Sequence, residues 1–316
     1  MTISVYTTYR KYIYILAALI FVLISSCNEQ GGYLPSSGGG AYEVELVGKN
    51  DSALDVVLHT LETPIAGLPQ EEPSFDVKEG KKLNSLTKLA HTIVKININP
   101  IHAGSTSVKY EKNVSAEPQM IVIINAESLS RLKKDIPHIS KGLLANLTAH
   151  QMNVQMRILK KHHNVDAEKL VKKNFGINIW VPLDMNRSKV GRNFIWLSNN
   201  SPEGMKNICI WESNTISLPD TKLSENIKGE TNSMNMHTVA HFVQSKGKDK
   251  IIYRGLWEMQ GDAMGGPFVE YIYLRGKKQL NCYAFVYAPE KEKRTLMRQL
   301  ESSLYTIQLK YSKNGK

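Results

Sequence analysis

The first part of the chain shows strand-like patterns of apolar positions and one helical stretch. Residues 42–47 alternate polar and apolar side chains, which predicts a strand at the edge of a sheet. Residues 51–61 have helical spacing, with Asp51 or Ser52 as the expected cap. Residues 120–124 are apolar throughout and predict a central strand. A further strand is expected at 92–98, and a hairpin or loop at 104–110.

A long helical pattern begins near Ser128, is expected to be interrupted at Pro137, and continues to about His163. Its second part places one stripe of side chains toward a core: Leu143, Leu147, His150, Val154 and Ile158. His150 falls on the buried face, where a hydrogen-bonded core histidine is expected. Residues 290–309 predict a closing helix with an inward face formed by Leu296, Leu300, Leu304 and Ile307.

Short strands dominate the second half of the sequence. The predicted elements are a helix at 167–174, strands at 177–181, 193–197 and 208–211, a helix at 236–245, and an antiparallel meander at 251–257, 268–274 and 283–287. Together these patterns predict an α+β fold with mostly antiparallel sheets and packed helices. Two strands followed by an amphipathic helix occur in both 92–158 and 268–309, so two related α+β modules remain an alternative to one large domain.

The N-terminus has the layout of an export signal. Arg10 and Lys11 precede an apolar run at 12–24, which ends in Ser25-Ser26-Cys27. This ending resembles the bacterial lipobox, and the run is shorter than the ~20 residues that span a bilayer as a helix. We therefore expect residues 1–27 to be a lipoprotein signal peptide that ends at a lipidated Cys27. A flexible Gly/Ser-rich tether at 28–40 and a globular region at 41–316, divisible into 41–165 and 166–316, would follow.

Composition describes a folded, basic protein. Apolar residues make up 42% and charged residues 22% of the chain, which is typical of a globular protein. The formal net charge is +11; the leader holds two of the 40 basic residues and none of the 29 acidic ones, so +9 remains after Cys27. This charge is either a solubility excess or favours anionic neighbours such as lipid headgroups and acidic glycans. Nucleic acid is not an expected partner of an exported protein.

Cysteine and histidine spacing predicts no metal site and no cofactor. Apart from Cys27, the thiols are Cys209 and Cys282, which lie in apolar strands and form either a disulfide or two independent core residues. His237 and His241 would share one face of the helix expected there, yet Thr238 stands where a zincin needs its glutamate. A copper or zinc site with Met234 and Met236 is the weaker alternative.

The run RGLWEMQGDAMGGPF at 254–268 is the most distinctive motif of the chain. It occurs with Leu68-Pro-Gln70, Glu72-Pro73, Phe194-Ile-Trp196, Tyr287-Ala-Pro289, Lys293-Arg294 and Arg298-Gln-Leu-Glu301. We refer to these as the signature positions. Together they resemble the exported lipoproteins called domain of unknown function 4837, found in Bacteroidetes-type Gram-negative bacteria, over nearly all of the chain after Cys27. The resemblance implies a location and an architecture; it brings no activity and no catalytic residue.

The glycine-rich part of that motif is the candidate binding loop. Gly265 and Gly266 would allow close approach of a ligand, with Arg254 as a donor, Trp257 as an aromatic platform and Asp262 as an acceptor. The alternative is an elaborate turn packed on its own domain. On the last helix, a shared basic face is either solvated or binds anions; it consists of Lys291, Arg294 and Arg298.

These features predict a lipoprotein anchored through Cys27 in the cell envelope, on the periplasmic side of an outer membrane. We expect a binding or assembly module rather than an enzyme, with an envelope protein or an anionic glycan or lipid as its partner. The alternative is a hydrolase acting on an envelope polymer. The sequence contains no Gly-x-Ser-x-Gly nucleophile elbow, although catalytic triads assemble in space and need no such motif.

Overall fold

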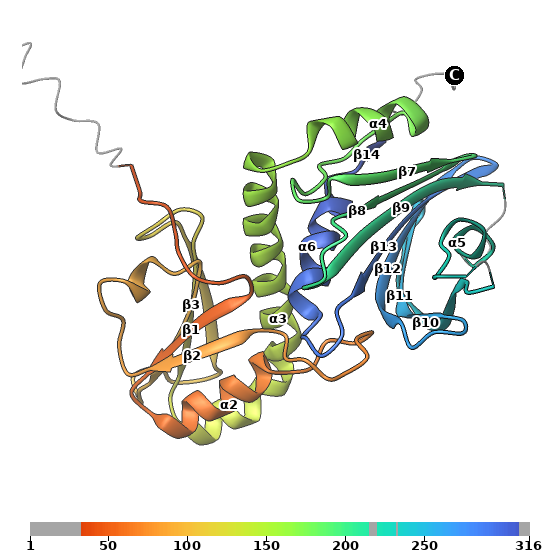
Figure 1. The fold of residues 1–316 in the computed structure, drawn as a ribbon. Helices are drawn as coiled ribbons and strands as arrows, with labels where there is room; N and C mark the ends of the chain where they lie inside the picture. Colours follow the sequence, from red (N-terminus) through yellow and green to blue (C-terminus); the bar gives the residue numbers. More distant parts are fainter. Residues whose placement is uncertain (1–32, 215–219, 232, 310–316) are drawn as a thin grey trace, which may run out of the picture.

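The computed structural model describes residues 33–214, 220–231 and 233–309 and confirms the α+β class. A five-stranded sheet with the order β2-β1-β3-β5-β4 forms the first module. The second module is a seven-stranded sheet with the order β10-β11-β12-β13-β9-β8-β7. Helices α3 (Leu129–Lys161) and α6 (Arg294–Tyr305) lie side by side between the two sheets (Figure 1). None of the helices in the described ranges is both long and apolar enough for a membrane span.

The first sheet is mostly parallel. β1 (Glu43–Gly48), β2 (Asp76–Gly80), β3 (Thr92–Ile98) and β5 (Met120–Ala126) run in one direction. Only β4 (Ser107–Lys112) is antiparallel, and it fills the region expected to be a hairpin or loop. The central position of β5 is confirmed. The prediction of an edge strand at 42–47 is wrong, because β1 lies between β2 and β3. The polar and apolar side chains of β1 alternate because one face of the sheet is polar. On that face, Glu43 pairs with Lys78 at 2.7 Å.

The helix at 51–61 is confirmed as α2 (Asp51–Leu61), with a different cap from the one expected. The side chain of Asn50 accepts a hydrogen bond from the Ala53 amide at 3.0 Å, so the cap lies one residue earlier. Helix α3 runs through Pro137 without interruption. Proline removes one backbone hydrogen bond, and the buried side chains of Leu132 and Leu143 on either side hold the helix on the sheet.

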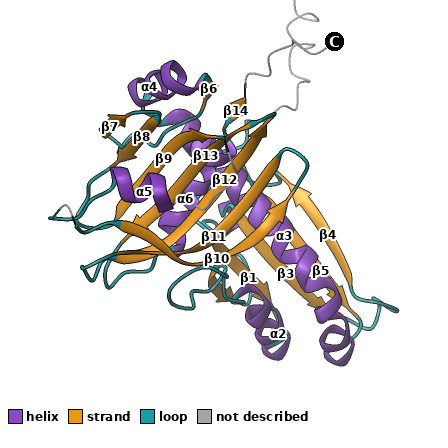
Figure 2. Cartoon of the chain, turned by 90° about the vertical axis from the view of Figure 1, so that its right-hand side faces the viewer, coloured by secondary structure: helices purple, strands orange, loops and turns teal. Residues whose placement is uncertain are grey.

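The stripe predicted on α3 is buried except for Ile158, which is exposed. His150 is a hydrogen-bonded core histidine, as expected: its Nε2 lies 2.8 Å from the backbone oxygen of His91. The remaining helices of the described chain are η1 (Thr87–Leu89), α4 (Val165–Phe175) and α5 (Asp220–Asn226). Helix α5 lies on the face of the second sheet opposite to α6 (Figures 1 and 2).

The second sheet is antiparallel throughout and contains the predicted meander. Its strands are β7 (Arg187–Gly191), β8 (Phe194–Ser198), β9 (Met205–Ser213), β10 (Met236–Lys246), β11 (Lys250–Met259), β12 (Gly265–Arg275) and β13 (Lys278–Tyr287). The helix predicted at 236–245 is wrong, because β10 pairs with β11 along its whole length. Tertiary pairing overrides a helical pattern in such a segment. The strand predicted at 177–181 shortens to β6 (Ile177–Asn178), which pairs with β14 (Gln308–Leu309).

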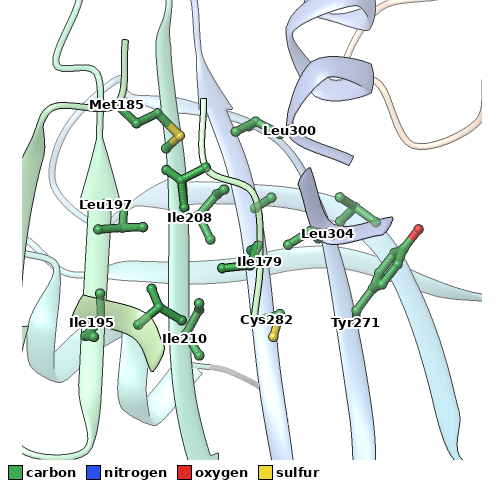
Figure 3. Packing of buried hydrophobic residues seen from close by; sticks show 14 of the residues in the cluster. Ile179, Met185, Ile195, Leu197, Ile208, Ile210, Tyr271, Cys282, Leu300 and Leu304 are labelled. Carbon is green, nitrogen blue, oxygen red and sulfur yellow. The ribbon is translucent and has the colours of Figure 1, made fainter. Parts of the chain in front are cut away.

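Each face of the second sheet carries its own core. The face toward α4 and α6 packs aliphatic side chains (Figure 3), among them Ile195, Ile208 and Leu300. The face toward α5 packs mostly aromatic side chains, among them Trp211 and Phe268.

The two cysteines of the described chain belong to these different cores. Cys282 lies in the aliphatic core and Cys209 in the aromatic core. In the register of β9 and β13, Cys282 is opposite Ile210 and Cys209 is opposite Tyr283. Because successive side chains of a strand point to opposite faces, the sheet separates the two sulfurs. Both cysteines are free, so the disulfide alternative is wrong, and burial raises the pKa of both thiols.

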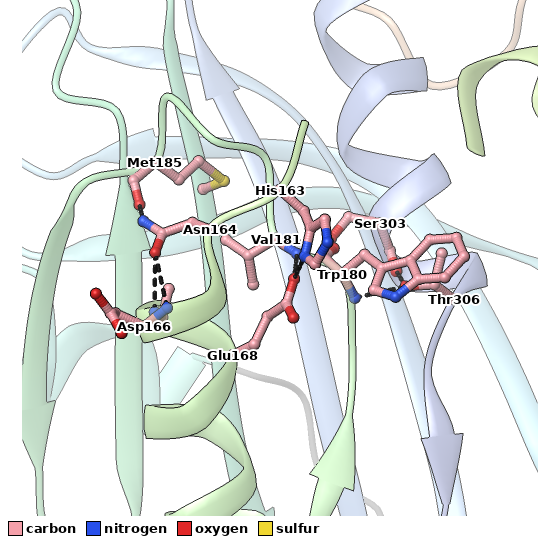
Figure 4. Close-up of polar contacts among 10 residues, drawn as sticks. His163, Asn164, Asp166, Glu168, Trp180, Val181, Met185, Ser303 and Thr306 are labelled. Carbon is pink, nitrogen blue, oxygen red and sulfur yellow. Dashed lines mark hydrogen bonds and ion pairs between the residues drawn. The ribbon is translucent and has the colours of Figure 1, made fainter. Parts of the chain in front are cut away.

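The connection between the modules is fixed by hydrogen bonds around the start of α4 (Figure 4). The Glu168 carboxylate accepts the Val181 amide at 3.1 Å and lies 2.7 Å from Nδ1 of His163. The amide of Trp180 donates to Oγ1 of Thr306, the residue that follows α6, at 2.8 Å. The end of α3, the start of α4 and the end of α6 are thereby joined at one place.

The segment expected to be a tether is bonded to the first module over its described end. The amides of Ser37 and Gly38 donate to the backbone oxygens of Glu117 and Leu89, at 3.1 and 3.0 Å. Oγ of Ser37 donates to the backbone oxygen of Pro118 at 2.6 Å. A flexible tether would therefore end before this contact. Cys27 lies outside the described residues.

Candidate functional site

The residues of the candidate binding loop do not form one site. Arg254 and Trp257 lie three positions apart on β11 and therefore point to opposite faces of the sheet. Gly265 and Gly266 belong to β12. Asp262 is exposed in the turn between these strands, where its Oδ1 accepts the Ala263 amide at 2.7 Å. Residues 260–264 thus form the turn that joins β11 to β12.

Gly266 has a packing role beneath Trp257. The two residues are paired across β11 and β12. The Trp257 indole is almost fully buried and donates from Nε1 to the backbone oxygen of Val286 at 3.2 Å. A Cβ atom on Gly266 would lie 2.1 Å from that same oxygen and 3.3 Å from the indole nitrogen. Glycine is therefore required so that the indole can reach across β12 to β13.

Arg254 belongs to a buried ionic network against α6. Its guanidinium pairs with the Glu301 carboxylate and also bonds Gln244. Tyr271 donates its hydroxyl to the same Glu301 oxygen at 3.3 Å, and burial raises the pKa of Tyr271. Arg298 lies 3.6 Å from the other Glu301 oxygen. Two guanidinium groups thus neutralise one buried carboxylate.

The basic face predicted on the last helix is largely an interface between the modules. Arg294 is 1% exposed, pairs with Asp76 at the start of β2, and donates to the Pro73 oxygen at 2.8 Å. The guanidinium of Arg298 lies 5.2 Å from the ring centre of Tyr42. Burial raises the pKa of Tyr42 to about 12, against the lowering effect of Arg298. Neither arginine forms the solvated or anion-binding face considered from the sequence.

The first module also caps the last helix of the second. Both oxygens of the buried Glu72 carboxylate accept backbone amides at the start of α6, from Lys293 at 2.8 Å and from Arg294 at 2.7 Å. A carboxylate at this position satisfies unpaired amides and complements the helix dipole. Three signature positions, namely Glu72, Arg294 and Arg298, thus join the modules, whereas the ion pair of Arg254 and Glu301 holds α6 on its own sheet.

His237 and His241 do not form a metal site. Both lie on β10, where four residues span about 13 Å, rather than on one turn of a helix. Across the ranges that the structure covers, no group of three or more His, Cys, Asp or Glu residues is placed to hold a metal ion.

A groove of about 430 Å³ opens on the α5 face of the second sheet. It lies at the sheet end where β8, β11 and β13 finish and where β7 and β9 begin. Residues 227–229, between α5 and β10, form one wall. A cavity of this size holds a small organic ligand or one or two sugar rings.

The groove has an aromatic floor and a basic rim. The floor consists of Trp196, Trp257, Phe285 and Tyr287, with Met205, Met259 and Met264 beside it. The rings of Trp257 and Phe285 are 5.1 Å apart and meet edge to face. Arg187, Lys189 and Lys228 stand on the rim and are exposed.

The electrostatics of the groove favour an anion. Among the lining residues in the described chain there is no acidic side chain, no histidine and no cysteine. Nζ of Lys189 donates to the backbone oxygen of Asn226 at 2.8 Å, directly before the wall formed by residues 227–229. An apolar ring and a negative charge on one ligand would therefore both find partners here.

Sequence reasoning finds only part of this groove. It singles out Trp257 as an aromatic platform, and this residue contributes to the floor. The rim residues and Trp196 come from strands distant along the chain, so their proximity depends on sheet order. The signal present in the sequence is the occurrence of Trp196 and Tyr287 among the signature positions.

The fold and this groove define a two-module α+β protein with a ligand-sized cleft on its second sheet. Residues 164–306 match the family model "Domain of unknown function (DUF4837)", which confirms the resemblance over that part. Residues 37–160 match a second model, "Domain of unknown function (DUF8532)". The positions at 68–73 thus lie in the second match, although the sequence resemblance assigns them to the first family. No curated protein matches the chain.

Proposed function

We propose that this protein is a membrane-anchored envelope lipoprotein that binds an anionic glycan in the groove of its second sheet. The observation that carries the proposal is the combination of aromatic floor and basic rim in one cleft. Sugar rings present apolar faces that pack on aromatic side chains, and their carboxylate or phosphate groups would pair with Arg187 and Lys189.

The same groove supports binding over hydrolysis. Glycoside hydrolysis needs a pair of carboxyl groups, and ester or peptide hydrolysis needs an activated nucleophile with a base. The described lining residues include serines, and none of them supplies a carboxylate or an imidazole. A hydrolase acting on an envelope polymer is the second candidate function, and its catalytic residues would have to lie elsewhere in the chain.

The lipid anchor is the second component of the proposal. The lipobox-like ending at Cys27 and the basic and apolar stretches before it support it. Several acyl chains on one cysteine would hold the protein at the bilayer. The groove would then collect acidic glycan segments next to the membrane that carries the anchor.

The binding test is a titration of the full chain in detergent with oligogalacturonide, monitored by tryptophan fluorescence. The fully methyl-esterified oligogalacturonide is the comparison ligand, because it has the same sugar rings without the charge. We expect the acidic form to bind and the ester to bind much more weakly, because the rim carries only positive charge. Trp196→Leu should weaken binding roughly three- to tenfold through the lost ring contact.

Two matched variants control this experiment. Trp180→Leu removes an indole outside the groove, and Lys172→Gln removes an exposed lysine on α4. Neither should change the affinity, whereas Lys189→Gln should weaken binding of the acidic form alone. Equal affinity for the two forms of the oligosaccharide, or equal losses in control and groove variants, would refute the assignment. Steady product release that one polar substitution abolishes would favour the hydrolase.

A further inference from the structure

A second cavity, of about 760 Å³, lies in the first module, at the carboxyl ends of its parallel strands. It is bounded by residues 47–50 at the end of β1, residues 81–83 after β2 and residues 95–99 at the end of β3. The groove described above belongs to the other module, so this cavity is a separate feature.

The chain leaves two neighbouring strands in opposite directions at this cavity. After β1 it crosses the sheet through α2, whose buried side chains pack on the face that α3 also covers. After β2 it crosses the other face, where Leu83 and Ala90 pack against Ile93. β3 then lies on the far side of β1 from β2. Diverging connections of this kind leave a crevice outside the strand ends, which is where open α/β sheets bind ligands.

The crevice is lined by positive charge. Lys49, Lys81, Lys82 and Lys95 surround it, together with His102. Lys81 pairs with Asp51, an exposed residue in the first turn of α2. The other three lysines have no ion pair among the described residues. Four lysines that line one cavity repel each other through their positive charges, and a multivalent anion would relieve that repulsion.

The amide side chains of the crevice add donors. Oδ1 of Asn50 is occupied by the Ala53 amide, and Oδ1 of Asn99 accepts the Ile101 amide, each at 3.0 Å. The NH₂ group of each side chain therefore remains as a hydrogen-bond donor at the cavity. The N-terminus of α2 contributes little, because Asn50 already caps it and Asp51 adds a negative charge there.

We propose that this crevice binds a soluble, multiply charged anion of the phosphate class, such as a diphosphate or phosphomonoester group. The choice of a soluble anion over a lipid headgroup rests on the proposed anchor at Cys27. The N-terminal segment reaches the first module beside the amino ends of β3 and β5, through Gly38 and Ser36. The crevice lies at the opposite strand ends, roughly 20 Å away along β3.

The test is isothermal titration of the full chain in detergent with inorganic pyrophosphate. The site variant is K49Q/K81Q/K82Q/K95Q, and the control variant K133Q/K141Q/K172Q/K173Q removes the same charge from exposed lysines elsewhere. We expect wild type and control to bind alike, and the site variant to bind at least about tenfold more weakly. Pyrophosphate should also raise the melting temperature of wild type and control only.

Three outcomes would overturn the proposal: no heat of binding with wild type, equal weakening in both variants, or unchanged affinity in the site variant. Because all eight lysines are at least partly exposed, both variants should fold; circular dichroism checks this, and Lys95→Gln with Lys49→Gln is the milder substitute. The Trp196→Leu protein should bind pyrophosphate normally. This measurement separates anion binding in the crevice from glycan binding in the groove, so each proposal can be refuted without the other.

Discussion

Trp257 and Asp262 lie five residues apart in the same signature motif but have different environments. The indole is 1% exposed, contacts Phe285 and Tyr287 at their ring edges, and has its nitrogen bonded. Asp262 is exposed and bonded only within its turn. The motif is therefore not one functional unit, and its two most conspicuous side chains should respond differently to substitution.

Trp257→Ala should lower the free energy of unfolding by about 3–5 kcal/mol, because it leaves a large cavity in the aromatic core. Asp262→Ala should change it by less than about 1 kcal/mol and leave glycan binding intact. Chemical denaturation of both variants measures these values. A large loss in Asp262→Ala would show that the turn has a role that its exposure does not indicate.

His91 and His150 make stability depend on pH. Burial lowers the pKa of both, and both are hydrogen-bonded, His91 through Nδ1 to Oγ of Ser37 at 2.7 Å. At pH values between the pKa in the folded protein and the unfolded pKa of about 6.5, the unfolded chain binds more protons than the folded one. The melting temperature should thus fall as the pH drops below about 6.5. His150→Gln should flatten this dependence, and an unchanged slope would contradict the assignment.

At the scale of elements, α6 depends on a residue far away in sequence for its first turn. Glu72 accepts the amides of Lys293 and Arg294, and Arg294 reaches back to Asp76. The network of Arg254, Arg298 and Glu301 holds the other side of the same helix. The contacts of α6 with Glu72 and Asp76 couple the folding of the two modules.

Glu72→Ala should destabilise the protein by about 1–3 kcal/mol, since two buried amides lose their acceptor. Glu72→Gln keeps one oxygen and should cost less. Hydrogen exchange at α6 should rise in both variants, more in the first, while exchange in β3 and β5 stays slow. Protection of α6 that is identical to wild type would mean that the cap is not needed.

Local patterns predict α2, β3, β5, the meander and α6 because each has a clear apolar period and caps or turns at its ends. They fail at β10. Its exposed apolar residues Val239 and Val243 are four positions apart, as on one face of a helix, but its backbone pairs with β11. The helical pattern places the arginines of α6 on a surface because residues far away in the sequence cover them, Asp76 at Arg294 and Tyr42 at Arg298. The groove and the crevice depend on strand order, which no local pattern contains.

At the scale of the whole molecule, the proposed membrane location depends on Cys27, which lies outside the described residues. Cys27→Ser should block acylation and leave the protein soluble or as an uncleaved precursor. Membrane fractionation with intact-mass analysis measures this outcome, and Cys209→Ser is the matched control because that thiol is buried and free. A Cys27→Ser protein that stays in the membrane fraction at the wild-type mature mass would contradict the lipobox assignment.

Methionine footprinting tests whether an anionic glycan occupies the groove of the second sheet, and it does not require the exact glycan to be identified. Met205 and Met264 line the groove, whereas the half-buried Met156 lies on α3 and is the internal control. The full chain is oxidised with and without an acidic glycan extract of the envelope, and sulfoxide formation is measured by mass spectrometry. We predict protection of Met205 and Met264 and no change at Met156. Unchanged oxidation of the two groove methionines, or equal protection of all three, would contradict glycan binding in the groove.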